Sequence, residues 1–253
     1  MMKIDLRGEL AVITGGGSGI GLGIAQALVS CGSKVAILGR DSQKLEQASH
    51  QLGDQARGFV LDVNETTRHA KVLSSITDTF DHPISILVNN AGNHLKKPLL
   101  ETSDDAFAEV MQTHVASSFA LSRNVIEHSM KPNKKGTILF ISSMAAFLAI
   151  PNIVAYTTAK AAIGGLVRSL MAESALYGIR INAIAPGWID TDMMRAAVNE
   201  DESRKQRIVQ RIPAGKFGMV NDIGNTAAFL CSPFASYING VTLPVDGGAL
   251  NSF

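Results

Sequence analysis

Residues 10–21 read LAVITGGGSGIG, and this stretch determines the fold that the sequence predicts. Its first part, Leu10–Ile13, is a short apolar run of the kind that a parallel strand buried on both faces produces. Five glycines follow within Gly15–Gly21, and a helical pattern through Ala25 and Leu28 comes next. A strand, a glycine turn and a helix form the context of a dinucleotide-phosphate site, because glycines let backbone amides approach the pyrophosphate. An ordinary tight turn explains so many glycines poorly.

Further apolar runs predict more strands of the same sheet. They are Lys34–Leu38, Gly58–Leu61, Ile84–Val88 and Gly136–Ser143. Helical segments at about 42–52, 65–80 and 104–130 alternate with these strands. Right-handed crossovers then give an α/β fold, a doubly wound parallel sheet with helices on both faces. Because no Ser-, Gly- or Pro-rich linker interrupts the chain, we expect residues 1–253 to form one domain.

The residue that ends the second strand bears on the choice of cofactor. An acid there binds the ribose hydroxyls of NAD, whereas an arginine accommodates the 2′-phosphate of NADP. The sequence has Gly39-Arg40 at this point, with Asp41 directly after it, so NADP is favoured and NAD stays open. The third strand ends in Asp62-Val63, where a carboxylate can meet the adenine amino group.

Tyr156 and Lys160 are the candidates for proton transfer. They lie four residues apart in a segment rich in alanine, leucine and valine, so they share one helix face. A neighbouring ammonium stabilises phenolate, which makes Tyr156 a plausible proton donor to a carbonyl. Ser143 closes a predicted strand at the sheet edge where α/β proteins bind ligands. A Tyr-x-x-x-Lys pair alone also arises by chance, as a solvated pair.

Composition excludes several classes of partner. Lys and Arg number 23 against 22 Asp and Glu without a basic block, which argues against nucleic acid. Cys31 and Cys231 lack the spacing of a metal site or a redox pair, so we expect no metal. The amino terminus carries no apolar signal core, and the longest apolar run is too short for a bilayer. We therefore expect a cytoplasmic protein that does not bind membranes.

Several motifs occur together along the chain. They are Thr14-Gly15-x-x-x-Gly19-x-Gly21, Asn89-Asn90-Ala91-Gly92, Ser143, Tyr156-x-x-x-Lys160, and Pro186-Gly187 with Thr191. In order and approximate spacing they resemble the motifs of the short-chain dehydrogenase/reductase family, over nearly the whole chain. The resemblance implies a single-domain Rossmann fold and an NAD(P)-dependent oxidoreductase that acts on CH–OH groups, commonly as a homotetramer.

The resemblance also implies a role for individual residues. Tyr156 would be the general acid/base, Lys160 would lower its pKa and bind the nicotinamide ribose, and Ser143 would orient the substrate oxygen. The residues implied to bind the cofactor are Gly15, Gly17, Ser18, Gly19, Ile20, Gly21, Arg40, Asp62, Val63, Asn89, Ala91, Gly92, Tyr156, Lys160, Pro186, Gly187, Ile189 and Thr191.

The chain departs from the family pattern at His114. Members usually carry an asparagine there, which supports a water chain leading protons to the lysine. Histidine can donate and accept through its two ring nitrogens, so His114 is kept as a fourth catalytic candidate. A histidine that is merely packed, or an impaired site, are the alternatives.

The small-molecule substrate is a carbonyl or alcohol compound, and specificity is expected in two segments. One is Trp188–Phe217, a charged stretch that we expect to act as a lid, and the other is the polar loop Asn93–Pro98. The pattern is similar to gluconate 5-dehydrogenases, which act on keto sugar acids, and scarcely less similar to 3-oxoacyl-acyl-carrier-protein reductases. For the latter, Arg123, Lys131, Lys134 and Lys135 offer a basic docking surface. An NADP-binding regulatory protein of weak activity is the third hypothesis.

Overall fold

Seven parallel strands make the central sheet of the computed structural model, which describes residues 3–192, 194–195 and 202–252. The strands are β1 (Leu10–Thr14), β2 (Lys34–Gly39), β3 (Ala56–Val60), β4 (Ile84–Asn89), β5 (Gly136–Ile141), β6 (Ile179–Pro186) and β9 (Thr242–Val245). Their order across the sheet is β3-β2-β1-β4-β5-β6-β9, and every neighbouring pair is parallel. The order reverses direction between β1 and β4, which is where a doubly wound sheet binds ligands.

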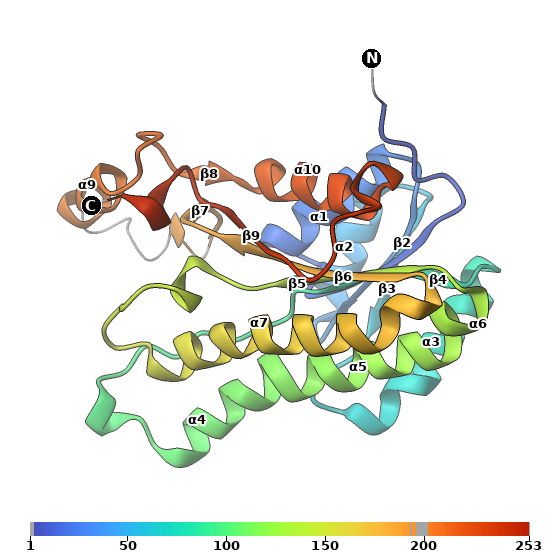
Figure 1. Cartoon of the computed structure of the whole chain (residues 1–253), viewed down its shortest axis with the longest axis horizontal. Coiled ribbons are helices and arrows are strands. Elements are labelled where there is room, and N and C mark those ends of the chain that lie inside the picture. The colour runs from blue at the N-terminus through green and yellow to red at the C-terminus, as the bar shows by residue number, and fades with distance from the viewer. Residues whose placement is uncertain (1–2, 193, 196–201, 253) are drawn as a thin grey trace.

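Helices cover both faces of the sheet (Figure 1). One face packs against α1 (Gly19–Ser30), α2 (Ser42–Leu52) and α10 (Val220–Cys231). The other packs against α3 (His69–Phe80), α5 (Ser117–Val125) and α7 (Val154–Ser174), and α4 (Asp104–Met111) contacts α7. The remaining elements include α6 (Lys131–Asn133), α9 (Glu202–Gln210) and a small sheet of β7 (Ile189–Asp190) with β8 (Gly218–Met219).

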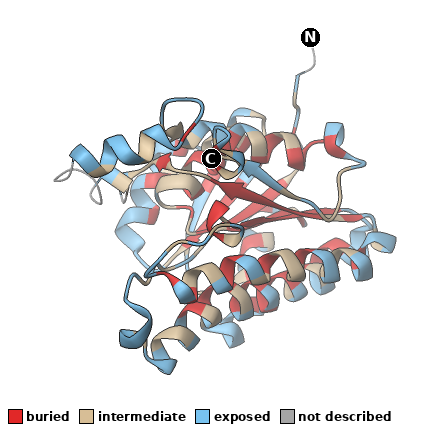
Figure 2. Ribbon diagram, turned by 60° about the vertical axis from the view of Figure 1, so that its left-hand side comes forward, coloured by how far each residue is buried: buried red, intermediate tan, exposed pale blue. Residues whose placement is uncertain are grey.

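Alternation along the strands explains why the core has two halves. Ala11 and Ile13 of β1 belong to the cluster under α1, α2 and α10, whereas Leu10 and Val12 belong to the cluster under α3, α5 and α7. All four side chains are fully buried, because side chains point to opposite faces in turn and helices cover each face. The buried residues of Figure 2 accordingly concentrate on the strands and on the inner sides of the helices.

The predicted fold class is confirmed, and several element boundaries differ from their predictions. The third strand begins at Ala56 and ends at Val60. The fifth strand ends at Ile141, because Ser143 already caps the short 3₁₀ turn Met144–Ala146. The last strand of the sheet spans only Thr242–Val245. A 3₁₀ turn, Thr66–Arg68, precedes α3.

A further difference concerns the predicted helix over 104–130. The structure contains α4 and α5 with π-helical turns at Gln112–Ala116 and Ile126–Met130. A π turn inserts an extra residue into the helix without changing its apolar pattern enough to be read from the sequence. The first of these turns carries His114.

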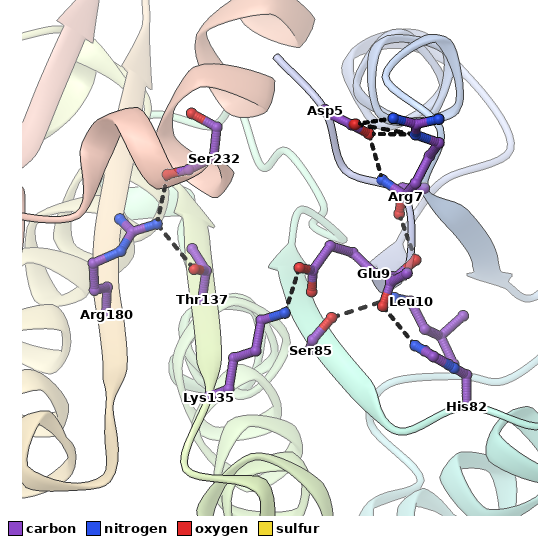
Figure 3. A network of polar contacts seen from close by, with 12 residues as sticks. Asp5, Arg7, Glu9, Leu10, His82, Ser85, Lys135, Thr137, Arg180 and Ser232 are labelled. Atoms are coloured by element: carbon purple, nitrogen blue, oxygen red, sulfur yellow. Dashed lines mark hydrogen bonds and ion pairs between the residues drawn. The ribbon is translucent and has the colours of Figure 1, made fainter.

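The amino and carboxyl ends of the strands define two opposite edges of the sheet, which carry different polar residues. At the amino-terminal edge, Lys135 and Glu9 form an ion pair, and Arg180 donates hydrogen bonds to Thr137 and to the carbonyl of Ser232 (Figure 3). The predicted cofactor and catalytic residues follow the carboxyl ends of the strands, at the opposite edge. No described helix has the length and apolarity to span a bilayer.

Candidate active site

The glycine turn after β1 is joined to the end of β4 by hydrogen bonds of Thr14 and Asn90. The Thr14 hydroxyl accepts from the amides of Asn90 and Ala91, each at 2.9 Å. The Asn90 side chain donates to the carbonyls of Thr14 at 2.9 Å and Gly15 at 3.2 Å. These bonds fix the turn against the switch point of the sheet.

Two glycines of this turn are required by close packing. Gly15 has φ +64°, and a Cβ there would lie 2.9 Å from the Asn90 side-chain nitrogen. A Cβ on Gly21 would overlap the Gly15 carbonyl. The turn is therefore compact enough for α1 to begin directly beside it.

The amino terminus of α1 has the properties of a phosphate site. Ser18 occupies the N-cap position with an extended backbone, its side chain makes no capping hydrogen bond, and the first turn carries no acid. Amides at a helix amino terminus favour negative charge. The geometry fits the pyrophosphate of a dinucleotide.

Arg40 lies at the end of β2 with its side chain 79% exposed, and its guanidinium is 3.9 Å from the Asp62 carboxylate. Asp62 accepts from the amide of Asn64 at 2.9 Å. Asp41 is the N-cap of α2 and accepts from the amide of Lys44 at 3.1 Å. The Asp41 carboxylate thus caps α2, and Arg40 is the charged side chain that projects from this strand end.

Lys160 is buried and attached to the end of β5. Its ammonium donates to the carbonyl of Ile141 at 2.7 Å, and the hydroxyl of Ser142 donates to the carbonyl of Lys160 at 3.0 Å. Burial lowers the pKa of Lys160 to about 7. The amine is therefore close to half protonated at neutral pH.

Tyr156 lies one helical turn before Lys160, and the ammonium is 5.5 Å from the centre of its ring. Burial raises the pKa of Tyr156 above its ordinary value, and a hydrogen bond with Ser143 lowers it in part. The Ser143 oxygen also accepts from the amide of Ala145 at 3.1 Å. In this structure burial outweighs that hydrogen bond, so the pKa of Tyr156 is raised rather than lowered.

His114 interlocks with the segment after β4. Its Nε2 lies 2.8 Å from the Asn93 carbonyl, to which it donates in the Nε2-protonated tautomer, and 3.2 Å from the Asn93 amide nitrogen. A Cβ on Gly92 would overlap its ring. The rings of His114 and Tyr156 lie edge to face, with centres 5.6 Å apart. Burial, and next the charge of Lys160, lower the pKa of His114 to about 4, so the imidazole is neutral at pH 7.

The other candidates divide into those near the glycine turn and those directed elsewhere. Thr191 lies near Gly19, because a Cβ added to Gly19 would lie 3.8 Å from the threonine methyl group. Gly187 packs against Asp246. The Asn89 side chain is buried and donates to Ser122 at 2.9 Å, so it ties β4 to α5. The Val63 carbonyl accepts from His69.

The candidate lid is only partly described. Asn199, Glu200 and Asp201, which form part of its charged stretch, lie outside the described residues. Its described part includes β7 and α9. Over the described residues, no three His, Cys, Asp or Glu side chains gather around a common metal position.

Sequence reasoning assigned no role to three residues that build the site, namely Thr14, Asn90 and Ser142, although the first two stand in its motifs. Each stands next to a residue that was singled out, but their roles depend on which strand ends become neighbours. A polar residue at the end of an otherwise apolar strand was the available signal.

Comparison with known proteins gives one family. A family model described as enoyl-(acyl carrier protein) reductase matches residues 15–249. The chain is 38% identical over 250 residues to 2-dehydro-3-deoxy-D-gluconate 5-dehydrogenase of Pseudoalteromonas atlantica, with 97% of each chain covered. It is 36% identical to the 3-oxoacyl-acyl-carrier-protein reductase FabG of Vibrio cholerae, covering 97% of this chain and 98% of that one.

A solved structure agrees with these relatives. Gluconate 5-dehydrogenase from Burkholderia cenocepacia, determined in complex with NADP and tartrate, is similar with a TM-score of 0.92 at 32% identity. The match covers 99% of this chain and 98% of that chain. Together with the fold and the motifs, these matches show that the chain belongs to the short-chain dehydrogenase/reductase family and is an NAD(P)-dependent oxidoreductase.

Proposed function

We propose that the protein uses NADP(H) to interconvert a keto sugar acid, such as 5-keto-gluconate, and the corresponding alcohol. The proposed reaction type rests on one observation. Ser143, Tyr156 and Lys160 come together where β5 ends and the first turns of α7 begin. Ser143 supplies a hydroxyl that orients the substrate, Tyr156 a phenol that transfers a proton, and Lys160 an amine that tunes the pKa of the phenol.

In the direction of reduction, Ser143 orients the substrate carbonyl and Tyr156 gives its phenolic proton to the carbonyl oxygen. A nicotinamide cofactor held by the glycine turn and Lys160 would supply the hydride for the carbonyl carbon, so that NADPH would be oxidised as the ketone is reduced. Lys160 stabilises the phenolate that remains and returns a proton to it. Oxidation of the alcohol follows the same steps in reverse, with Tyr156 as the base.

The preference for NADP rests on Arg40 and Asp41. Arg40 is exposed and directed to the strand end, whereas the Asp41 carboxylate caps α2. A cation at this position complements a 2′-phosphate. The Burkholderia cenocepacia relative was solved with NADP, which supports the same choice.

His114 is proposed to act on the catalytic group through position. As a neutral ring with its Nε2 proton donated to Asn93, it holds the loop after Gly92 against Tyr156. Its Nδ1 remains an acceptor that can take part in a proton relay toward Lys160.

The placement of basic residues favours the sugar acid over an acyl carrier protein. Lys131 begins α6, and Lys134 and Lys135 lie between α6 and the start of β5, at the amino-terminal edge of the sheet, where Lys135 is paired with Glu9 (Figure 3). That edge is opposite the candidate active site (Figure 1). A docked carrier protein there would hold its thioester far from Tyr156.

The experiment is a substrate panel followed by NADPH absorbance. We expect turnover with 5-keto-gluconate or a related keto sugar acid to exceed turnover with a 3-oxoacyl thioester, and NADPH to exceed NADH. Faster reduction of the thioester would replace the sugar-acid proposal by the acyl-carrier one. Tight NADPH binding without turnover on any carbonyl would support the regulatory hypothesis.

A further inference from the structure

The loop Gly92–Lys97 is fixed to the body of the protein at alternate residues. The carbonyl of Asn93 accepts from His114 at 2.8 Å. The side chain of Leu95 packs on the apolar cluster formed by α4 and α7. The amide of Lys97 donates to the carbonyl of Asn152 at 2.8 Å. The loop is therefore held in one place before any substrate arrives.

The intervening residues, His94 and Lys96, are not used in this attachment, and both are exposed. The His94 ring lies 4.9 Å from the Tyr156 ring, centre to centre, at an interplanar angle of 48°. Partial desolvation of the ring by its neighbours, and next the charge of Lys96, lower the pKa of His94. Lys96 follows His94 by two residues in the same loop.

The charge of Lys96 is not neutralised by the residues around it. Among the described residues Lys96 forms no ion pair. The nearby carboxylate of Glu109 is directed to the Asn93 side chain, at 3.5 Å. An ammonium without an ion-pair partner and an imidazole beside the catalytic phenol offer a charge and an N–H that a carboxylate can bind.

We propose that His94 and Lys96 form a subsite that binds the carboxylate of the substrate, with the Lys96 ammonium supplying the charge and the His94 ring a directed N–H. This inference rests on the proposed function and names the group of the sugar acid that the site recognises. The subsite would favour keto acids over neutral ketoses, because a neutral group gains no charge attraction from the ammonium.

The test measures binding in the Tyr156→Phe variant loaded with NADP⁺, so that no turnover interferes. Calorimetry compares gluconate with sorbitol, which has the same chain length and a hydroxymethyl group in place of the carboxylate. We expect gluconate to bind more tightly than sorbitol. Lys96→Gln should weaken the affinity for gluconate by about tenfold or more and leave the affinity for sorbitol unchanged. His94→Phe keeps a ring beside position 156 and is expected to weaken gluconate severalfold.

Lys97→Gln is the matched control, because it removes the same charge from the neighbouring residue of the same loop. It is expected to change gluconate binding less than twofold. Equal effects at positions 96 and 97, equal affinity for gluconate and sorbitol, or no saturable binding of gluconate would each overturn the subsite. Since this assay needs no chemistry, its failure is distinct from a failure of the parent enzyme to reduce keto sugar acids.

Discussion

The chemistry of the site depends on single residues whose ionisation is set by burial. Lys160 has a pKa of about 7 and His114 of about 4, whereas burial raises the pKa of Tyr156. Perturbed groups that converge at the edge of a parallel sheet are typical of catalytic centres. At this scale the most informative substitutions change one charge or one ring.

Arg40→Asp tests the cofactor preference. A carboxylate at the end of β2 repels a 2′-phosphate and can accept from ribose hydroxyls. We expect the ratio of kcat/KM for NADPH over NADH to fall by about tenfold or more, which corresponds to loss of one charge-assisted contact. An unchanged ratio would show that Arg40, exposed in the structure, is only a surface residue.

His114→Asn tests the buried neutral histidine through the pH dependence of stability. The pKa of His114 is about 4 in the folded protein and 6.5 in the unfolded chain, so the unfolded chain binds more protons between these pH values. Stability is therefore lost as pH falls through this window. Between pH 7 and pH 4.5 the parent should lose about 2 kcal/mol that the variant does not lose.

Urea unfolding at both pH values measures this difference. His69, which burial also affects, is present in both proteins and cancels. An equal loss of stability in parent and variant would contradict the placement of His114 as a neutral buried ring.

At the scale of elements, the site depends on a π-helical turn that the sequence pattern did not reveal. The strands β1 to β5 and α2 were predicted within a few residues, because apolar runs encode them locally, whereas β6 was not predicted. The π turn Gln112–Ala116 is instead stabilised by tertiary contacts, since Asn64 donates to Thr113 and accepts from Ser117. The interlock of His114 with Gly92 and Asn93 follows from this turn.

Gly92→Ala tests that interlock. Gly92 does not have a positive φ, so its substitution acts through overlap of the new methyl group with the His114 ring. We expect kcat/KM to fall by about tenfold, because displaced loop residues no longer meet Tyr156. The double variant Gly92→Ala/His114→Ala has room for the methyl group and should recover part of the loss; without recovery, the two residues act independently.

At the scale of the whole molecule, the sequence predicted which strand ends carry chemistry but not which become neighbours. Thr14, Asn90 and Ser142 gain their roles from the order of strands across the sheet, which is a long-range property. The same topology places the cofactor cradle and the catalytic pair at one edge, and Lys135 with its ion pair at the other.

Self-association is also a property of this scale. β9 ends the sheet, and no other described strand pairs with its outer side. Tyr237 is fully exposed and Leu243 is 38% exposed nearby. We propose a homo-oligomer, a tetramer by family resemblance, and expect light scattering to give a multiple of 26.8 kDa. Leu243→Asp should reduce that mass; a monomeric parent would contradict the proposal.

The most direct test of the account is NADPH-dependent reduction of 5-keto-gluconate by the parent protein and by Tyr156→Phe. Tyr237→Phe is the control, since it removes an equivalent hydroxyl from a fully exposed ring. We predict that Tyr156→Phe loses roughly 100-fold or more in kcat with NADPH affinity nearly unchanged, whereas Tyr237→Phe retains full activity. Equal turnover by Tyr156→Phe and the parent would contradict the assignment of Tyr156 as the proton donor.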